Sequence, residues 1–182
     1  MKRIGKLLFA IACVGALAAP LWVAATPRAP SSTPRPGPEL AYLQAVNALG
    51  PPSDPQLLFL LMGQFANANR RLEGIDFIQN LLNRFEPNLS DQQRALYLTA
   101  IASLRAGEAN DVFLLRRIGW VRDTVAMLDQ AKRLSANTAF VPRWMSGVVR
   151  AQLPRFFGER DNALAELTWC EQHMAQAPNR GW

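Results

Sequence analysis

The sequence predicts an all-α protein built from paired helices. Helix-favouring alanine, leucine, glutamine and arginine dominate, and valine, isoleucine and threonine show no alternation of the kind expected in strands. Apolar residues instead recur at helical spacing in several segments, which prolines and glycines separate. With 182 residues, of which 49% are hydrophobic, the chain is long enough to bury a substantial core.

Residues 1–25 have the pattern of an export signal. A positive start precedes the apolar or small residues 7–25, in which Pro20 is the one interruption, and residues 23–25 are small as a signal peptidase requires. We predict a cleaved signal peptide, with an uncleaved membrane anchor or a lipoprotein acylated at Cys13 as alternatives. All three place the remaining chain in the periplasm or elsewhere outside the cytoplasm.

Two further segments precede the main helical region. Residues 26–38 contain five prolines and no large apolar residue, which predicts an extended linker. Residues 39–49 predict a short helix, ended by Gly50, Pro51 and Pro52, that packs as a lid on the first helical hairpin. We therefore expect a helical-repeat domain over residues 39–182.

The first helical pair is predicted over residues 54–87. Asp54 can cap the first helix, and Pro55 occupies its first position, where a missing N–H costs nothing. The polar residues 67–71 form the turn, and Pro87 ends the second helix. The apolar residues of the pair are Leu57, Leu58, Phe59, Leu60, Leu61, Met62 and Phe65, then Leu72, Ile75, Ile78, Leu81, Leu82 and Phe85.

A second pair comes next in the chain. Ser90 with Gln93 predicts a capping box at the start of its first helix, and Gly107 closes that helix. Gly119 lies where the next helical segment could divide in two. The predicted buried residues are Tyr97, Ala100, Ile101 and Leu104 in the first helix, and Ile118, Val121, Val125 and Leu128 in the second.

The third pair begins near residue 140. Pro154 stops or kinks its first helix, Gly158 turns the chain, Asp161 caps the last helix and Pro178 ends it. The predicted buried residues are Val141, Met145, Val148 and Val149, then Ala163, Leu167, Cys170 and Met174.

These pairs resemble the tetratricopeptide repeat, in which two helices cross at small residues and a proline comes after the second helix. In the first pair Gly63 and Gly74 match the small positions; Ile78, Leu82 and Pro87 match later ones, while Leu81 stands where alanine is usual. The other pairs match in part, at Ala100, Gly107, Ala151, Gly158, Ala163 and Leu167. Gly74 and Ala163 are 89 residues apart, which is not a multiple of the roughly 34-residue period.

The resemblance implies a degenerate array of about three antiparallel helical hairpins over residues 54–178. An irregular helical bundle is the alternative. Residues 117–121 and 150–158 also look like helical-repeat segments of exported bacterial proteins, some of which carry a metallo-β-lactamase-like neighbouring domain. That domain's histidine-rich metal motif does not occur in this sequence.

Charge and histidine content argue against several functions. Three of the 20 basic residues lie in the leader, which leaves 17 against 14 acidic ones, too small an excess to favour nucleic acid. A single histidine, His173, rules out a multi-histidine metal site within the sequence. No glycine-rich phosphate loop or nucleophile elbow occurs. We predict no cofactor, no metal and no enzymatic activity.

The one cluster with catalytic potential is Glu166, Cys170 and His173. Their spacing would allow a shared helix face and a thiolate nucleophile. Cys170 falls on the apolar stripe, however, where a small buried cysteine is ordinary. We therefore interpret these residues as structural.

Polar and basic residues supply the candidate partner-binding set. In a hairpin array the first helix of each pair lines the concave side, which favours Gln64, Asn67, Gln93, Arg94, Arg143 and Arg150. A basic group lies near Trp120, and Arg116 or Arg117 is spaced to stack on the indole. The predicted partner-binding residues are Gln64, Asn67, Gln93, Arg94, Arg116, Arg117, Trp120, Arg143 and Arg150.

The sequence thus favours an exported, non-enzymatic helical-repeat protein that binds a protein or peptide in the bacterial envelope. Contact with the membrane is expected only through the leader, if it stays uncleaved. Two alternatives remain open: the helical part of a larger exported hydrolase, or a bundle that binds an apolar ligand near residues 57–62.

Overall fold

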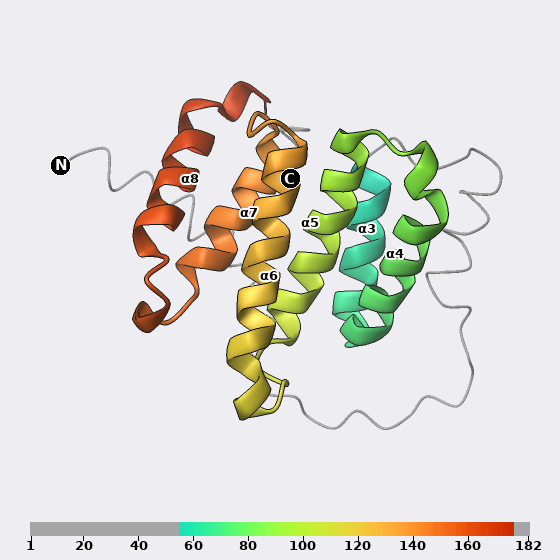
Figure 1. Cartoon of the computed structure of the whole chain (residues 1–182), viewed down its shortest axis with the longest axis horizontal. Coiled ribbons are helices and arrows are strands. Elements are labelled where there is room, and N and C mark those ends of the chain that lie inside the picture. Colours follow the sequence, from blue (N-terminus) through green and yellow to red (C-terminus); the bar gives the residue numbers. More distant parts are fainter. Residues whose placement is uncertain (1–54, 177–182) are drawn as a thin grey trace. The chain divides into compact units, whose positions relative to one another are not determined.

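The computed structural model describes residues 55–176, which form six α-helices joined by short turns (Figure 1). No strand occurs in this range, so the predicted all-α class is confirmed. The leader, the linker, the lid helix at 39–49, the cap Asp54 and the stop Pro178 lie outside the described residues. The helices are α3 (Pro55–Asn67), α4 (Arg71–Phe85), α5 (Asp91–Glu108), α6 (Leu114–Leu134), α7 (Phe140–Ala151) and α8 (Arg160–Gln172).

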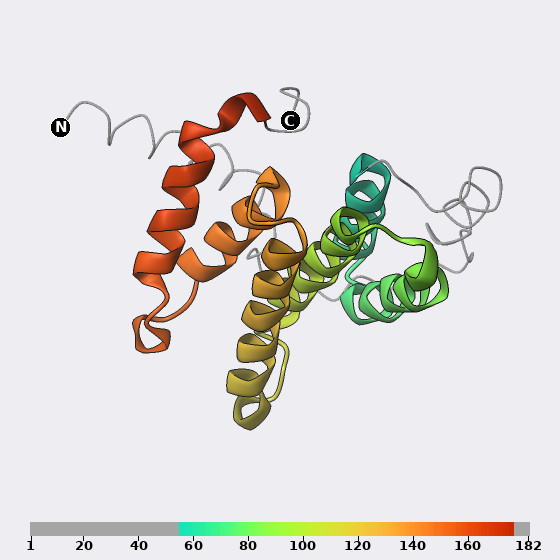
Figure 2. The same ribbon diagram turned by 45° about the horizontal axis from the view of Figure 1, so that its top comes forward.

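The helices pack as successive hairpins. α3 contacts α4, α5 contacts α6 and α7 contacts α8, as the predicted pairing requires. Each hairpin also packs on the next, because α5 contacts both α3 and α4, and α7 contacts both α5 and α6. Figures 1 and 2 show the resulting progression from α3 and α4 on one side to α7 and α8 on the other. The first helices of the three hairpins therefore touch in succession.

Local sequence explains several element boundaries. Ser90 and Gln93 form the predicted capping box: the Ser90 hydroxyl accepts from the Gln93 N–H, and the Gln93 side chain accepts from the Ser90 N–H. Asn69 has a φ of 56° in the turn between α3 and α4, a conformation that asparagine tolerates well. Gly158 has a φ of 70° and turns the chain before α8, as predicted.

The largest apolar core lies among α3, α4 and α5, with residues from α6 added to it. The predicted core residues Ile78, Leu81 and Leu82 are buried, and so are Tyr97, Ala100, Ile101 and Leu104. Other residues of the predicted stripes are exposed, since each helix buries only the side that meets a neighbour. These exceptions are Leu57, Leu60, Leu72, Ile118 and Met174.

Glycines mark two of the helix crossings. A Cβ on Gly74 would lie 2.8 Å from the Cβ of Phe65, so α3 and α4 cross closely at this position, as predicted. A Cβ on Gly147 would lie 2.8 Å from Leu167 Cγ, which marks the crossing of α7 and α8. Gly63, by contrast, has nothing within 4 Å of such an atom. The assignment of Gly63 to a crossing was wrong, because α3 meets α4 through Phe65.

Two predicted boundaries also differ. α6 continues through Gly119 without a break, since its hydrogen bonds and neighbours outweigh the low helix propensity of one glycine. α8 begins at Arg160 with Glu159 as the flanking residue, so Asp161 lies inside the first turn and does not cap the helix. An acidic residue there still interacts favourably with the positive end of the helix.

Candidate functional site

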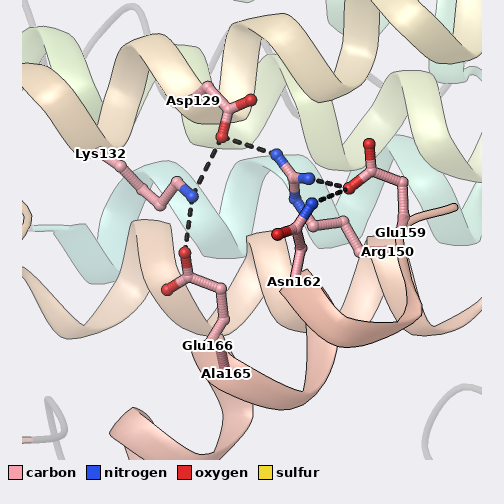
Figure 3. Close-up of a pocket in the computed structure, with 7 residues that line it drawn as sticks. All are labelled: Asp129, Lys132, Arg150, Glu159, Asn162, Ala165 and Glu166. Carbon is pink, nitrogen blue, oxygen red and sulfur yellow. Dashed lines mark hydrogen bonds and ion pairs between the residues drawn. The ribbon is translucent and has the colours of Figure 1, made fainter.

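The most elaborate polar site lies among α6, α7 and α8. It surrounds a pocket of about 360 Å³ and is drawn in Figure 3. The pocket is lined by Asp129, Lys132, Arg150, Glu159, Asn162, Ala165 and Glu166. With Arg143 beside it, we refer to the charged members of this group as the interhairpin ion network, because they join the second hairpin to the third.

Arg150 is the centre of the network and is only 4% exposed. Its Nε donates to the Ser146 hydroxyl at 3.0 Å, one helical turn earlier in α7. Its two terminal nitrogens reach two carboxylates on different segments: Asp129 of α6 at 2.6 Å, and Glu159 just before α8. The planar guanidinium makes this division of contacts possible, since its donors point in fixed, separate directions.

Lys132 and Arg143 extend the network along α8. The Lys132 Nζ lies 2.6 Å from Glu166 Oε1 and 3.0 Å from Asp129 Oδ1. The Arg143 Nε lies 3.4 Å from the other Glu166 oxygen, and its guanidinium stacks over the Trp169 ring at 4.3 Å. Helices α6, α7 and α8 are thus connected through charged side chains.

The network is electrically balanced. Burial by itself would raise the pKa of Asp129, but hydrogen bonds and charge from Lys132 and Arg150 outweigh it and lower that pKa. Three cations face three carboxylates, and each cation contacts at least one of them. The polar lining does not suit an apolar ligand, and the pairing leaves little net charge for attracting an ion.

Cys170 lies on α8 near Glu166 of this network, and His173 directly follows the helix. Burial, with a smaller contribution from Glu166, raises the pKa of the Cys170 thiol to about 11, so it is protonated at neutral pH. The His173 ring stacks on Trp169 with 4.0 Å between centroids, and its Nδ1 lies 2.8 Å from the Trp169 carbonyl. This geometry favours packing over nucleophilic chemistry.

Trp120 has a different cationic partner from the one predicted. The guanidinium of Arg105, on α5, lies 3.9 Å from the ring centroid, while the Trp120 Nε1–H donates to the Arg105 carbonyl at 2.8 Å. Arg117 instead donates to the carbonyls of Asn110 and Val112, and Arg116 is exposed. The predicted stacking by Arg116 or Arg117 was wrong, since the helix-spacing argument considered only residues of α6.

The predicted partner-binding residues fall in several places. Gln64 and Asn67 are exposed on α3, while Gln93 and Arg94 lie at the start of α5 and are held by local hydrogen bonds. Arg116, Arg117 and Trp120 lie at the N-terminal end of α6. Arg143 and Arg150 both belong to the interhairpin ion network, where their contacts are within the chain.

The sequence did not predict that Asp129, Lys132 and Glu159 share a site, and Glu166 was considered only together with Cys170 and His173. The i,i+3 spacing of Asp129 and Lys132 predicts a shared helix face. Nothing in the local sequence, however, tells which face of α6 would meet Arg150 and Glu166.

Comparison of the chain with protein-family models, with curated proteins and with solved structures finds no match. Residues 55–176 contain no group of three or more histidine, cysteine or acidic side chains arranged to hold a metal ion. None of the helices in the same range combines the length and apolar content needed to cross a bilayer.

Proposed function

We propose that the chain is a non-enzymatic binding protein: a short tetratricopeptide-like stack of three helical hairpins that presents a surface to a protein or peptide. The pattern of helix contacts supports this proposal. Each first helix touches its own partner helix, α5 touches both α3 and α7, and α5 and α7 also touch the preceding second helix. Such nearest-neighbour stacking is the arrangement through which hairpin repeats build extended binding surfaces.

The observation that carries the proposal is the face of α3 that is left exposed by the other described helices. Leu58, Leu61 and Phe65 are buried against α4 and α5, whereas Leu57, Leu60, Gln64 and Asn67 are exposed. The exposed four recur every three or four residues and therefore share one side of the helix. We call them the α3 stripe.

The α3 stripe combines apolar and amide side chains, and Leu60 is 63% exposed. Protein interfaces combine buried apolar side chains with polar side chains beside them, and this stripe offers both, with the leucines toward its N-terminal end and the amides toward its C-terminal end. Two predicted partner-binding residues, Gln64 and Asn67, belong to it. The stripe is a better surface for a partner than the interhairpin ion network, whose charged groups already neutralise one another.

The predicted leader completes the proposal, placing the binding protein in the periplasm or on the periplasmic side of the inner membrane. A mass measurement on the protein recovered from cell fractions tests this part. Recovery of the chain from the periplasm, shortened by about 25 residues, would support it; recovery from the cytoplasm at full length would contradict it.

A photocrosslinking amino acid tests the α3 stripe. The full chain would carry the crosslinker at position 60 or, as a matched control, at position 164, where Leu164 on α8 is 59% exposed. We expect a discrete adduct with another protein from position 60 only. The partner identified in this way should bind a Leu60→Gln, Gln64→Lys double variant at least about tenfold more weakly, and a Leu164→Gln variant unchanged. Adducts confined to the chain itself would overturn the proposal.

A further inference from the structure

The N-terminal end of α6 carries a second exposed apolar surface, separate from the α3 stripe. Phe113 is 69% exposed, Leu115 is 83% exposed and Ile118 is 47% exposed. Single exposed apolar residues are ordinary on protein surfaces, but three within six residues at one helix end form a local patch. We refer to residues 112–122 as the α6 tip.

The α6 tip projects from the rest of the helices. In Figures 1 and 2 the N-terminal end of α6, drawn in yellow, extends beyond the neighbouring ends of α5, α7 and α8. The large exposed fraction of Leu115 agrees with this position. The patch therefore lies on a protruding end of the structure, where a deformable surface such as a lipid bilayer can contact it.

Hydrogen bonds hold the backbone of the tip in place. The Arg117 side chain donates to the Asn110 carbonyl at 2.6 Å and to the Val112 carbonyl at 3.1 Å. The backbone N–H groups of Arg116 and Arg117 donate to the Phe113 carbonyl. The carbonyls that lead into α6 thus have partners, which lowers the cost of moving this segment into a less polar environment.

Arginines flank the apolar residues. Leu115, Ile118 and Arg122 share one side of α6, since they are three and four residues apart, and Arg116 adjoins them. Arg116 and Arg122 are exposed and form no ion pair with another described residue.

The acidic groups nearby do not cancel these two charges. Asp111 is exposed, but Glu108 lies 4.0 Å from Arg71, and Asp123 lies 3.7 Å from Arg105. Among the described residues near the tip, Arg116 and Arg122 are therefore available to an anionic partner, and Asp111 is the one neighbouring acid without an ion pair.

We propose that the α6 tip docks on the surface of an anionic lipid bilayer. Phe113, Leu115 and Ile118 would enter the boundary between headgroups and acyl chains, while Arg116 and Arg122 contact lipid phosphates. Apolar side chains with neighbouring cations are the pattern of peripheral helices that lie at a membrane interface. This contact goes beyond the proposed binding function and leaves the α3 stripe free for a protein partner.

A fluorophore that responds to its environment tests the contact locally. In the full chain with Cys13→Ser, a nitrobenzoxadiazole label is attached at Leu115→Cys or, as the control, at Leu164→Cys. Cys170 is 1% exposed and should stay unlabelled, which the Cys13→Ser parent checks. Both labelled proteins share any contribution of the leader, so a difference between them reports the tip.

Vesicles of phosphatidylglycerol and phosphatidylcholine should raise the emission at position 115 about threefold or more, with little change at position 164. Substituting both Arg116 and Arg122 by glutamine should remove most of that rise, whereas the matched pair Arg133→Gln and Arg160→Gln should retain it. Vesicles of phosphatidylcholine alone should give a much smaller response.

Three results would overturn the proposal. The first is an equal response at positions 115 and 164, or none at either. The second is an equal response to neutral and anionic vesicles, which would mean that the arginines take no part. The third is a label at position 115 that already emits as if buried in the absence of lipid, which would mean that protein covers the tip.

Discussion

The two ends of the described region are held together by different forces. Around α3, α4 and α5 the contacts are almost entirely apolar, and Phe65, Ile78, Ile101 and Leu104 are nearly inaccessible to solvent. The second apolar cluster, where α7 packs on α5 and α6, is small, with Ala102, Leu128 and Val149 as its buried members, and α8 buries Ala163 and Cys170. In this region the interhairpin ion network also links α6 to α7 and to α8.

The difference matters because the two kinds of contact respond to different conditions. Apolar burial stabilises in proportion to the area removed from water and depends little on pH or salt. A buried ion pair must offset the cost of removing charges from water, so its net contribution is small while its partial loss is costly. We therefore expect the first hairpin to be sensitive to changes of volume and the third hairpin to changes of charge.

The largest expected loss of stability comes from a change in the apolar core among α3, α4 and α5. Phe65→Ala removes a ring that is 1% exposed and packs against Gly74 and Phe77. It should lower the free energy of unfolding by about 3–5 kcal/mol in urea titrations followed by circular dichroism. Phe156→Ala is the matched control, since that ring is 74% exposed, and it should change stability by less than about 0.5 kcal/mol. Equal losses would refute the assignment of the core.

Removing one charge tests the contribution of the interhairpin ion network. Arg150→Met keeps much of the side-chain volume but removes the cation that Asp129 and Glu159 share, so that Asp129 keeps only Lys132 and Glu159 keeps only the Asn162 amide. Because both carboxylates are partly exposed and keep another partner, we expect a loss of about 2–3 kcal/mol, at or below the lower limit of the roughly 3–5 kcal/mol for a broken buried pair. A triple variant that combines Arg150→Met with Asp129→Asn and Glu159→Gln should recover most of the lost stability, because no carboxylate is then left without the Arg150 charge. A negligible loss for Arg150→Met would show that the network contributes little.

The helix crossings give a smaller effect. Gly74→Leu places atoms where the Phe65 side chain already lies, and it should lower the free energy of unfolding by about 1–3 kcal/mol. Gly63→Ala adds a methyl group to the same hairpin with nothing within 4 Å, and it should raise stability by about 0.5–1 kcal/mol. Thermal melts of both proteins would measure the contrast. An unchanged melting temperature for Gly74→Leu would argue against a close crossing.

The smallest effect is the pH dependence of the ion network. The pKa of Asp129 is lower in the folded chain, so its ionised form favours folding. This stabilisation is complete above the ordinary carboxyl pKa and is lost as the pH falls through the lowered folded value. The stability difference between the natural chain and Asp129→Asn should therefore shrink as the pH falls from about 5 through the lowered pKa of folded Asp129. Urea titrations across that range measure it, and a constant difference would contradict the assignment.

The predictions from sequence succeeded where the decisive contacts are local. The capping box at Ser90, the turn at Gly158 and the buried stripe from Tyr97 to Leu104 depend on residues within a few positions of one another. The close crossing at Gly74 could also be predicted, because a glycine on an apolar helix face suggests close approach. Gly63 shows the limit of that argument, since α4 passes elsewhere.

The candidate sites depended on partners far apart in the chain. Arg105 stacks on Trp120 from 15 positions away, and Lys132 pairs with Glu166 across 34 positions. Helix spacing places residues on a face but does not tell which other face will meet it. Trp120 therefore stacks with Arg105 of the neighbouring helix α5, and not with Arg116 or Arg117 as predicted.

The sequence by itself determined the class of fold, the succession of helical pairs and most of the buried positions in the first two hairpins. These follow from helix propensity, apolar spacing and breaker residues, which act over one or two helical turns. Only the tertiary structure decided which charged residues join the hairpins and which apolar residues stay exposed on α3 and at the α6 tip. Those outcomes depend on how each helix rotates and crosses its neighbours, and local sequence does not fix that geometry.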